Sequence, residues 1–338
     1  MLNRRQLVQA ATLSLTLGLG VGRAFAQDTV KVGLLSLTSH APSIIADGKG
    51  YFAAQNLKVE FVSFQAAQPM AVAIASGDVD FGVTAISGSL ISLAEKDVIR
   101  IIGGALTEAG DVPGQRILVS RAAYDEGVTT PAKLKGRSFG NTTAGSSFHY
   151  MAHKIADKEG FPRSEIHLKT LQKVPAVIAA LKSGQVDAWS IVPNIAEGLT
   201  KDGSVVDIGR VADYIDGYQV TVIFTSKARA TGKRDLVQRF LKGFGQGVDT
   251  YNAALVDKTL GPAETDEVVA MIHKYVYSSD PLEKATPRIK AGAMRISPNG
   301  RLNLKSVEDQ LAWFKSEDLV PPGVTMQQLV DTSYVATN

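Results

Sequence analysis

The sequence contains one pentapeptide twice, as Ser-Gly-Asp-Val-Asp at residues 76–80 and as Ser-Gly-Gln-Val-Asp at residues 183–187. Each copy follows an apolar helical stretch and precedes a short apolar run. A glycine after an apolar helix is a common helix stop, and a short apolar run after it is typical of a buried parallel strand. Because the same helix–glycine–strand unit lies in both halves, the sequence predicts two α/β lobes of similar build.

Strand and helix patterns alternate on both sides of each pentapeptide, which predicts parallel sheets with crossover helices. From residue 233 onward the pattern becomes helical. We expect a first lobe at residues 27–110 and a second lobe at residues 111–217. Residues 218–338 would supply a return strand and C-terminal helices that pack on the first lobe. The chain would cross between the lobes near residues 106–115 and 216–220.

The first 26 residues have the pattern of an export signal. Arg4 and Arg5 form a basic start, residues 10–21 are apolar, and Ala-Phe-Ala at residues 24–26 is a cleavage site of the small-x-small type. The apolar run is shorter than the ~20 residues that a membrane span needs. We expect cleavage near Ala26 and a periplasmic mature protein. Residues 3–7 partly resemble a twin-arginine signal, so both export routes stay open.

The composition of the chain excludes several kinds of site and partner. The chain has no cysteine, which excludes disulfides, thiolate metal sites and a lipid-anchored N-terminal cysteine. The formal charge of +3 comes from three arginines in residues 1–26, so the remaining chain is neutral. A neutral chain argues against nucleic acid and against anionic membrane surfaces as partners.

A further set of short motifs runs in order along nearly the whole chain after residue 26. They are Lys-Gly-Tyr-Phe at 49–52, Leu-Lys-Val at 57–59, the two pentapeptides, Leu-Lys-Gly-Arg at 134–137, Gly-Ser-Ser-Phe-His-Tyr at 145–150, and Gly-Arg-Leu at 300–302 with Gln310, Trp313 and Phe314. This ordered set resembles the periplasmic solute-binding proteins of ABC importers, in the branch that handles sulfonates, taurine, nitrate and thiamin-pyrimidine precursors. The resemblance implies a type II periplasmic-binding-protein-like fold, in which two α/β lobes joined by two hinge strands close over one ligand.

The loops after the strands are the expected ligand site, because open α/β sheets bind ligands beyond the carboxyl ends of their strands. The loop at residues 141–147 carries the clearest signal, since it is polar, contains glycine and leads into a helix. Free amides and the positive end of a helix dipole attract anions, although any helix needs such an N-cap. The candidate ligand-binding residues are Ser39, His40, Gln65, Thr84, Ser87, Thr143, Ser146, Ser147, Trp189, Pro193 and Tyr218.

The candidate loops contain no acidic residue, which favours a simple carboxylate or sulfonate as the ligand. Asp213 and Asp216, near the return crossing, keep taurine and pyrimidines open. Catalytic chemistry is not expected. A zinc-peptidase helix would need Glu between His149 and His153, where this chain has Tyr150, and Gly-Ser-Ser-Phe is not a nucleophile elbow. We therefore expect no catalytic residue, no metal and no cofactor.

Two other functions compete with import. A relative of the family makes thiamin pyrimidine by self-sacrifice, but that chemistry is associated with a cysteine-rich motif that this chain lacks. A sensor that presents its ligand to a membrane kinase stays open. The sequence favours a monomeric, non-enzymatic binding protein that captures a small organic anion by hinge closure and delivers it to an ABC permease, without inserting into the membrane.

Overall fold

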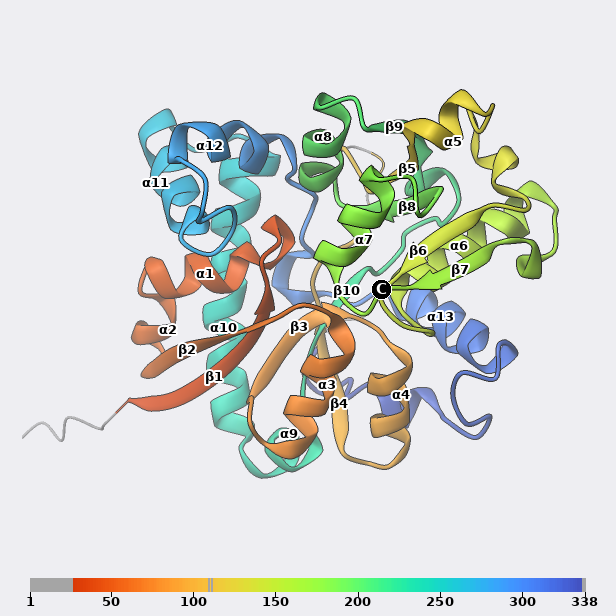
Figure 1. The fold of residues 1–338 in the computed structure, drawn as a ribbon. Coiled ribbons are helices and arrows are strands. Elements are labelled where there is room, and N and C mark those ends of the chain that lie inside the picture. Colours follow the sequence, from red (N-terminus) through yellow and green to blue (C-terminus); the bar gives the residue numbers. More distant parts are fainter. Residues whose placement is uncertain (1–26, 109, 111, 336–338) are drawn as a thin grey trace, which may run out of the picture.

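A computed structural model describes residues 27–108, 110 and 112–335 of the chain. The predicted export signal at residues 1–26 lies outside these residues. Figure 1 shows two α/β lobes, with the first sheet at the lower left and the second at the right. The described helices include none that is long and apolar enough to cross a membrane.

The first lobe contains a five-stranded sheet in the order β2-β1-β3-β10-β4. Its strands are β1 (Asp28–Leu35), β2 (Leu57–Phe64), β3 (Phe81–Ala85), β4 (Ile99–Gly104) and β10 (Thr221–Ser226). β1 pairs in parallel with β2 and β3, whereas β10 runs antiparallel to β3 and β4.

The second lobe repeats this arrangement in the order β7-β6-β8-β5-β9. Its strands are β5 (Arg116–Ser120), β6 (Ser138–Asn141), β7 (His167–Thr170), β8 (Ala188–Ile191) and β9 (Val205–Arg210). β6 is parallel to β7 and β8, and β5 is antiparallel to β8 and β9. The two matching sheets confirm the predicted pair of α/β lobes. The expectation of purely parallel sheets was wrong, because β5 and β10 enter their sheets from the other lobe and run in the opposite direction.

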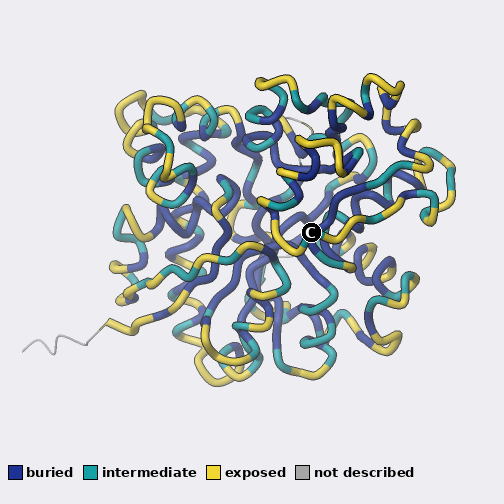
Figure 2. The backbone as a smooth tube through the Cα atoms, in the orientation of Figure 1, coloured by how far each residue is buried: buried dark blue, intermediate teal, exposed yellow. Residues whose placement is uncertain are grey.

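The helices of the two lobes flank these sheets. In the first lobe they are η1 (Thr38–His40), α1 (Ala41–Gly48), α2 (Tyr51–Ala54), α3 (Ala67–Ser76), α4 (Gly88–Glu95), α9 (Lys227–Gly232) and α10 (Arg234–Tyr251). In the second lobe they are α5 (Arg121–Asp125), η2 (Pro131–Leu134), α6 (Ser147–Glu159), η3 (Arg163–Glu165), α7 (Val174–Lys182), α8 (Pro193–Lys201) and η4 (Val211–Asp213). Figure 2 shows the buried residues running along both sheets, with the exposed ones at the periphery.

The glycine of each pentapeptide ends a helix in the left-handed conformation. Gly77 caps α3 with φ 84°, and Gly184 follows α7 with φ 75°. Residues with a Cβ rarely adopt such angles, so glycine is the residue that lets the chain turn here into β3 and β8. This use of both glycines confirms the helix–glycine–strand interpretation.

The final aspartate of each pentapeptide joins two parallel strands. An Asp80 carboxylate oxygen accepts the backbone amide of Lys31 at 2.6 Å. An Asp187 carboxylate oxygen accepts the backbone amide of Ser138 at 2.8 Å. Lys31 and Ser138 lie in β1 and β6, the strands that occupy matching places in the two sheets. The repeat therefore serves the same purpose in both lobes.

The two crossing segments lie side by side between the lobes. The backbone amide of Glu108 donates to the carbonyl of Tyr218 at 2.9 Å, and the amide of Val220 donates to the carbonyl of Leu106 at 2.8 Å. The expected return strand from residue 218 is therefore divided: residues 218–220 belong to the crossing, and β10 begins at Thr221.

The C-terminal part of the chain contacts both lobes. Its elements are η5, a π-helix (Asn252–Val256), α11 (Pro262–His273), α12 (Leu282–Ala291), η6 (Pro298–Gly300), α13 (Leu304–Ser316) and α14 (Met326–Leu329). α10 packs on α1 and α2, whereas α12 packs on α8 of the second lobe. α13 reaches α6, where Asp309 accepts hydrogen bonds from the Tyr150 hydroxyl and the Lys154 amine.

The spacing of Ser306 and Asp309 is typical of a capping box at the start of α13, but the structure caps this helix differently. Asn303 is the N-cap, and its side chain accepts the backbone amide of Ser306 at 3.2 Å. The Ser306 hydroxyl instead accepts the backbone amide of Gln219 in the return crossing at 2.9 Å. Tertiary contacts thus use the two side chains that the local pattern assigned to the cap.

Candidate functional site

A cavity of ≈ 60 Å³ lies between the lobes, where the carboxyl-terminal turns of the two sheets meet. Both lobes and both crossing segments contribute to its wall. The lining residues are Leu35, Leu37, Ser39, His40, Ala66, Ala67, Thr84, Ala85, Leu106, Gln115, Thr142, Ser146, Ser147, Phe148, Val174, Ile191, Val192, Val220 and Thr221. None of these described residues carries a formal charge, so hydroxyl, amide and imidazole groups supply the polarity.

His40 is the titratable side chain of this wall. It is 2% exposed, and its Nδ1 accepts the backbone amide of Leu35 at 3.3 Å. Burial lowers the pKa of His40 to about 3, so the imidazole is neutral near pH 7. Because Nδ1 accepts a hydrogen bond, the proton resides on Nε2. His40 thus has an N–H donor for which no acceptor is found among the described residues.

The second polar element is the turn that leads into α6. Ser146 is the N-cap of this helix, and its hydroxyl accepts the backbone amide of His149 at 3.4 Å. The backbone amides of Ser147 and Phe148, in the first turn, have no partner within the helix. The positive end of the helix dipole therefore points at the cavity wall and favours a negative charge there.

Gln115 is the wall residue that lies at the entry to the second lobe. A carboxylate oxygen of Glu108 accepts its backbone amide at 3.0 Å and its side-chain amide at 3.1 Å. Glu108 is buried, and this burial raises the pKa of its carboxyl group. The carboxyl group of Glu108 thus fixes the orientation of Gln115 at the crossing.

The lobes touch on two sides of the cavity through backbone hydrogen bonds. The amide of Val174, at the start of α7, donates to the carbonyl of Gln65 at 3.2 Å. The amide of Gly88, at the start of α4, donates to the carbonyl of Gly145 at 3.0 Å. The starts of α4 and α6 therefore contact each other directly.

Five of the predicted site residues line the cavity: Ser39, His40, Thr84, Ser146 and Ser147. Ser39 and His40 follow β1, Thr84 lies near the carboxyl end of β3, and Ser146 and Ser147 follow β6. These are the places where the strand-end rule puts a ligand.

Six predicted residues lie elsewhere. The side chain of Gln65 is exposed, Ser87 caps α4, and the carbonyl of Thr143 accepts the backbone amide of Ser146. Pro193 is the first residue of α8, beside the lining residue Val192. These four positions lie within two residues of the cavity wall in sequence, but they are not among the residues that line it.

Trp189 and Tyr218 are core residues. Trp189 is fully buried behind the lining residue Phe148, with ring centroids 5.2 Å apart. Tyr218 is also fully buried, and its ring lies 5.3 Å from that of Tyr150. Their burial reflects packing within and between the lobes, which a single-sequence pattern does not reveal.

Several lining residues were not predicted. Thr142 lies in the loop at residues 141–147, where three consecutive polar residues do not show which side chain faces the cavity. Gln115 and Thr221 lie in or beside the crossings, and Val174 begins α7. Only the approach of the two lobes brings these distant residues together, so no local signal could have found them.

One group of potential metal ligands occurs among the described residues, formed by His149, His153 and Glu317. The two histidine Nε2 atoms are 3.1 Å apart. The Nδ1 atom of His149 accepts the backbone amide of Gly145 at 3.1 Å, so its proton resides on Nε2. A protonated Nε2 offers no lone pair to a metal. The group therefore fits a hydrogen-bonded pair of imidazoles better than a metal centre.

Comparison with known proteins gives the family. The family model described as NMT1/THI5 like matches residues 37–254, which is more than half of the chain. A search of curated proteins with the sequence found no match.

Solved structures share the fold at low sequence identity. The ligand-binding component of an ABC-type import system from Staphylococcus aureus, with zinc bound, is 14% identical, with a TM-score of 0.71 over 91% of this chain and 98% of that one. The alkanesulfonate-binding protein SsuA from Xanthomonas axonopodis pv. citri, bound to MOPS, is 19% identical, with a TM-score of 0.67 over 92% and 98%.

The fold also occurs in an enzyme. The desulfurization enzyme DSZB is 16% identical, with a TM-score of 0.57 over 92% of this chain and 97% of that one. The fold therefore does not by itself separate binding proteins from enzymes. By its family model and its two matching lobes, the chain belongs to the NMT1/THI5-like family and has the periplasmic-binding-protein-like fold.

Proposed function

We propose that this protein is the substrate-binding protein of an ABC importer and captures a small organic anion, a carboxylate or a sulfonate. One observation carries the proposal: the cavity between the lobes combines the N-terminal end of α6 with the free Nε2–H of His40. It has no acidic side chain on its wall. The family membership and the binding proteins that share the fold support the same class of function.

The anionic end of the ligand would lie between His40 and the first turn of α6. Ser39, Ser146 and Ser147 would donate hydroxyl hydrogen bonds, and the apolar wall would contact the rest of the ligand. Helix amides and neutral donors bind anions without a paired lysine or arginine. A micromolar dissociation constant, or about −8 kcal/mol, is the weakest affinity that we expect.

Hinge closure would couple binding to transport. The hydrogen bonds between Val174 and Gln65 and between Gly88 and Gly145 would characterise the closed form. The paired crossings at residues 105–108 and 218–221 would act as the hinge. A ligand that bridges both lobes shifts the population toward this closed form, whose surface the permease would recognise.

We further propose that the protein acts as a monomer in the periplasm after cleavage near residue 26. Its partners would be the ligand and the permease, with no nucleic acid and no membrane insertion.

We propose that the protein binds its ligand without catalysing a reaction. The neighbouring hydroxyl of Ser39 would need a base to become a nucleophile. Nδ1 of His40 is occupied by the amide of Leu35, and Nε2 carries the proton. The imidazole therefore lacks a free lone pair with which to activate Ser39.

A thermal-shift screen of residues 27–338 tests the ligand class. The panel contains sulfonates, dicarboxylates, aromatic carboxylates, nitrate, taurine and thiamin precursors. A ligand that binds only the native state raises the melting temperature. We expect a rise with one class of carboxylates or sulfonates. A rise with thiamin precursors alone would contradict the organic-anion proposal. The proposal would also be contradicted if no compound in the panel raised the melting temperature.

A further inference from the structure

Helix α13 is attached to the first lobe on both sides of its own segment. Before the helix, the backbone amide of Ser297 donates to the carbonyl of Ala105, directly after β4, at 2.8 Å. After the helix, α14 packs on α4 and β4, and the amide of Asp331 donates to the carbonyl of Ile101 in β4 at 2.9 Å. The chain therefore leaves the first lobe at α13 and returns to it.

The start of α13 is bonded to the return crossing beside the cavity. The Ser306 hydroxyl accepts the backbone amide of Gln219 at 2.9 Å, and the side-chain amide of Gln310 donates to the carbonyl of Gln219 at 3.0 Å. The buried side-chain amide of Gln219 in turn donates to the carbonyls of Leu106 and Thr221 at 3.2 and 2.9 Å. Because Leu106 and Thr221 line the cavity, this end of α13 is fixed on the cavity wall.

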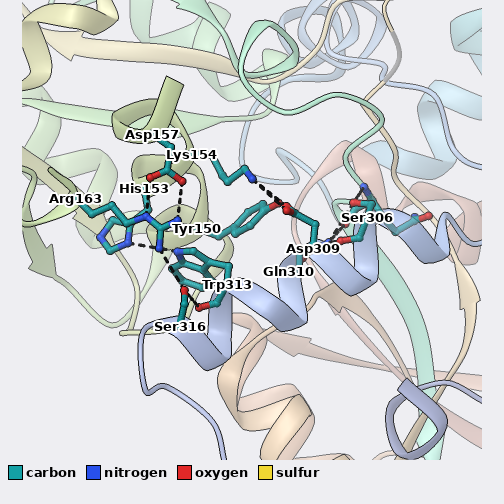
Figure 3. A network of polar contacts seen from close by, with 11 residues as sticks. Tyr150, His153, Lys154, Asp157, Arg163, Ser306, Asp309, Gln310, Trp313 and Ser316 are labelled. Carbon is teal, nitrogen blue, oxygen red and sulfur yellow. Dashed lines mark hydrogen bonds and ion pairs between the residues drawn. The ribbon is translucent and has the colours of Figure 1, made fainter. Parts of the chain in front are cut away.

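Another face of α13 lies on α6 of the second lobe, as Figure 3 shows. A carboxylate oxygen of Asp309 accepts the hydroxyl of Tyr150 and, at 3.0 Å, the amine of Lys154. Burial, and then the hydrogen bond to Asp309, raise the pKa of Tyr150 above its usual range. The Tyr150 hydroxyl therefore keeps its proton near pH 7 and donates it to the carboxylate.

The contact with the second lobe continues along α13 at intervals of four residues. The indole N–H of Trp313 donates to Nδ1 of His153 on α6 at 3.3 Å. At the end of the helix, Glu317 accepts the guanidinium of Arg163 at 2.6 Å. Arg163 is also paired with Asp157 of α6 at 2.7 Å. Residues four apart share one face of a helix, so successive turns of α13 bond to the second lobe.

α13 also packs on the place where the two lobes touch beside the cavity. The carbonyl of Gly145, in the loop at residues 141–147, accepts the amide of Gly88 from the first lobe at 3.0 Å. A Cβ added to Gly145 would lie 3.1 Å from the ring of the buried Phe314, and one added to Gly88 would lie 3.8 Å from it. Phe314 of α13 therefore lies against both glycines of this contact.

We propose that α13 is a strap of the first lobe that holds α6, and with it the loop at residues 141–147, against that lobe. This role rests on the proposed hinge closure, because opening the lobes would separate α6 from α13. The strap would stabilise the closed form before any ligand binds. Since apparent affinity rises with the population of the competent form, the strap would strengthen binding without touching the ligand.

Two matched substitutions separate the strap from other hydroxyl contacts of the second lobe. Tyr150→Phe removes the hydrogen bond between α6 and Asp309 of α13. Tyr214→Phe is the control, because the Tyr214 hydroxyl donates to a carboxylate oxygen of Glu159 at 2.6 Å within the second lobe. Both variants lose one hydroxyl that donates to a carboxylate, and only the first loses a contact with the strap.

The backbone amide of Gly88 reports the separation of the lobes. Gly88 is the first residue of α4, so its amide has no acceptor within the helix. Its acceptor is the carbonyl of Gly145 in the other lobe. The amide of Gly136 is the reference, since it donates to the carbonyl of Glu165 at 2.7 Å within the second lobe.

The test measures amide hydrogen exchange by NMR in the ligand-free protein labelled with 15N-glycine. We expect the Gly88 amide to exchange about tenfold faster in Tyr150→Phe than in Tyr214→Phe, with equal rates at Gly136. Equal rates at Gly88 in the two variants would overturn the proposal. An equal acceleration at Gly88 and Gly136 would indicate a general loss of stability and would also overturn it.

A second pair of variants serves if Tyr150→Phe does not fold. Lys154→Met removes the ion pair with Asp309, and Lys182→Met removes an ion pair with Asp202, at 2.6 Å, within the second lobe. We expect Gly88 to exchange about threefold faster in Lys154→Met than in Lys182→Met, and equal rates would overturn the proposal. Both measurements are made without ligand, so they succeed or fail independently of the anion screen.

Discussion

The two lobes share one scaffold and differ in the turns that the scaffold presents. Both sheets have the same strand order, and the antiparallel pair at the edge is irregular at the same place, between Ile223 and Phe224 in one lobe and between Ile117 and Leu118 in the other. The turn after β1 supplies His40, whereas the turn after β6, which occupies the matching place in the second sheet, leads into α6. The strand order is therefore repeated between the lobes, whereas the polar groups that each lobe places on the cavity wall are different.

The largest difference that we predict concerns the aspartates of the pentapeptide. The mostly buried Asp80 carboxylate also pairs with the Arg229 guanidinium, whereas Asp187 bonds the amide and hydroxyl of Ser138. Asp80→Ala leaves a cation without its partner, so we expect a loss of about 3 kcal/mol. Asp187→Ala removes two hydrogen bonds and should cost about 2 kcal/mol. Urea unfolding measures the loss of stability in both variants. If the loss in Asp80→Ala equals or falls below the loss in Asp187→Ala, the ion pair with Arg229 adds no stability to the first lobe.

The second prediction compares stability at two pH values. The pKa of His40 is about 3 in the folded protein and that of His149 is also about 3, against 6.5 for a free imidazole. The unfolded chain therefore binds more protons, and stability falls as the pH drops from 6.5 toward 3. Protonation of His40 in the unfolded chain should by itself lower the free energy of unfolding by about 2 kcal/mol at pH 5 relative to pH 7.

The variant His40→Asn removes this titration from the first lobe. Its amide oxygen can accept the Leu35 amide in place of Nδ1, so the variant should fold. Urea unfolding at pH 5 and pH 7 should show a smaller loss for the variant than for the unmodified protein. An identical loss would mean that His40 is not buried as a neutral imidazole.

The third prediction tests the glycines of the repeat. Both have positive φ, and an added Cβ would meet nothing within 4 Å at Gly77 and only the Ala122 Cβ, at 3.5 Å, at Gly184. Substitution by alanine should therefore cost only backbone strain, about 1 kcal/mol at each site. Thermal unfolding of the two variants should give closely similar shifts. A much larger change in melting temperature for one variant would show that the two glycines do not have equivalent roles.

Much of the scaffold could be predicted from the sequence, because the deciding signals are local. Gly77 and Gly184 mark helix ends, and apolar runs mark the central strands. The antiparallel direction of β5 and β10 could not be predicted, since it arises from how the chain crosses between lobes. The same contrast applies to the cavity wall. The position of His40 and Ser146 after strands predicted them as site residues, whereas Gln115 joins the wall only through tertiary contacts.

The smallest effect on stability that we predict concerns the helix caps of the second lobe. Ser146 and Ser120 cap α6 and α5 through the same type of hydrogen bond, but only Ser146 lines the cavity. Substituting alanine should cost about 1 kcal/mol of stability at either site. Titration with the anion found in the screen should show weaker binding for Ser146→Ala and unchanged binding for Ser120→Ala. Equal affinities in both variants would remove Ser146 from the ligand site.

The most direct test of the central claim is calorimetric titration of residues 27–338 with the anion selected by the screen and with its neutral amide analogue. We expect micromolar or tighter binding of the anion. Binding of the amide should be weaker by at least tenfold, about 1.4 kcal/mol, because the dipole of α6 favours a negative charge. Equal affinity for the two compounds would contradict the claim that the cavity between the lobes is an anion site.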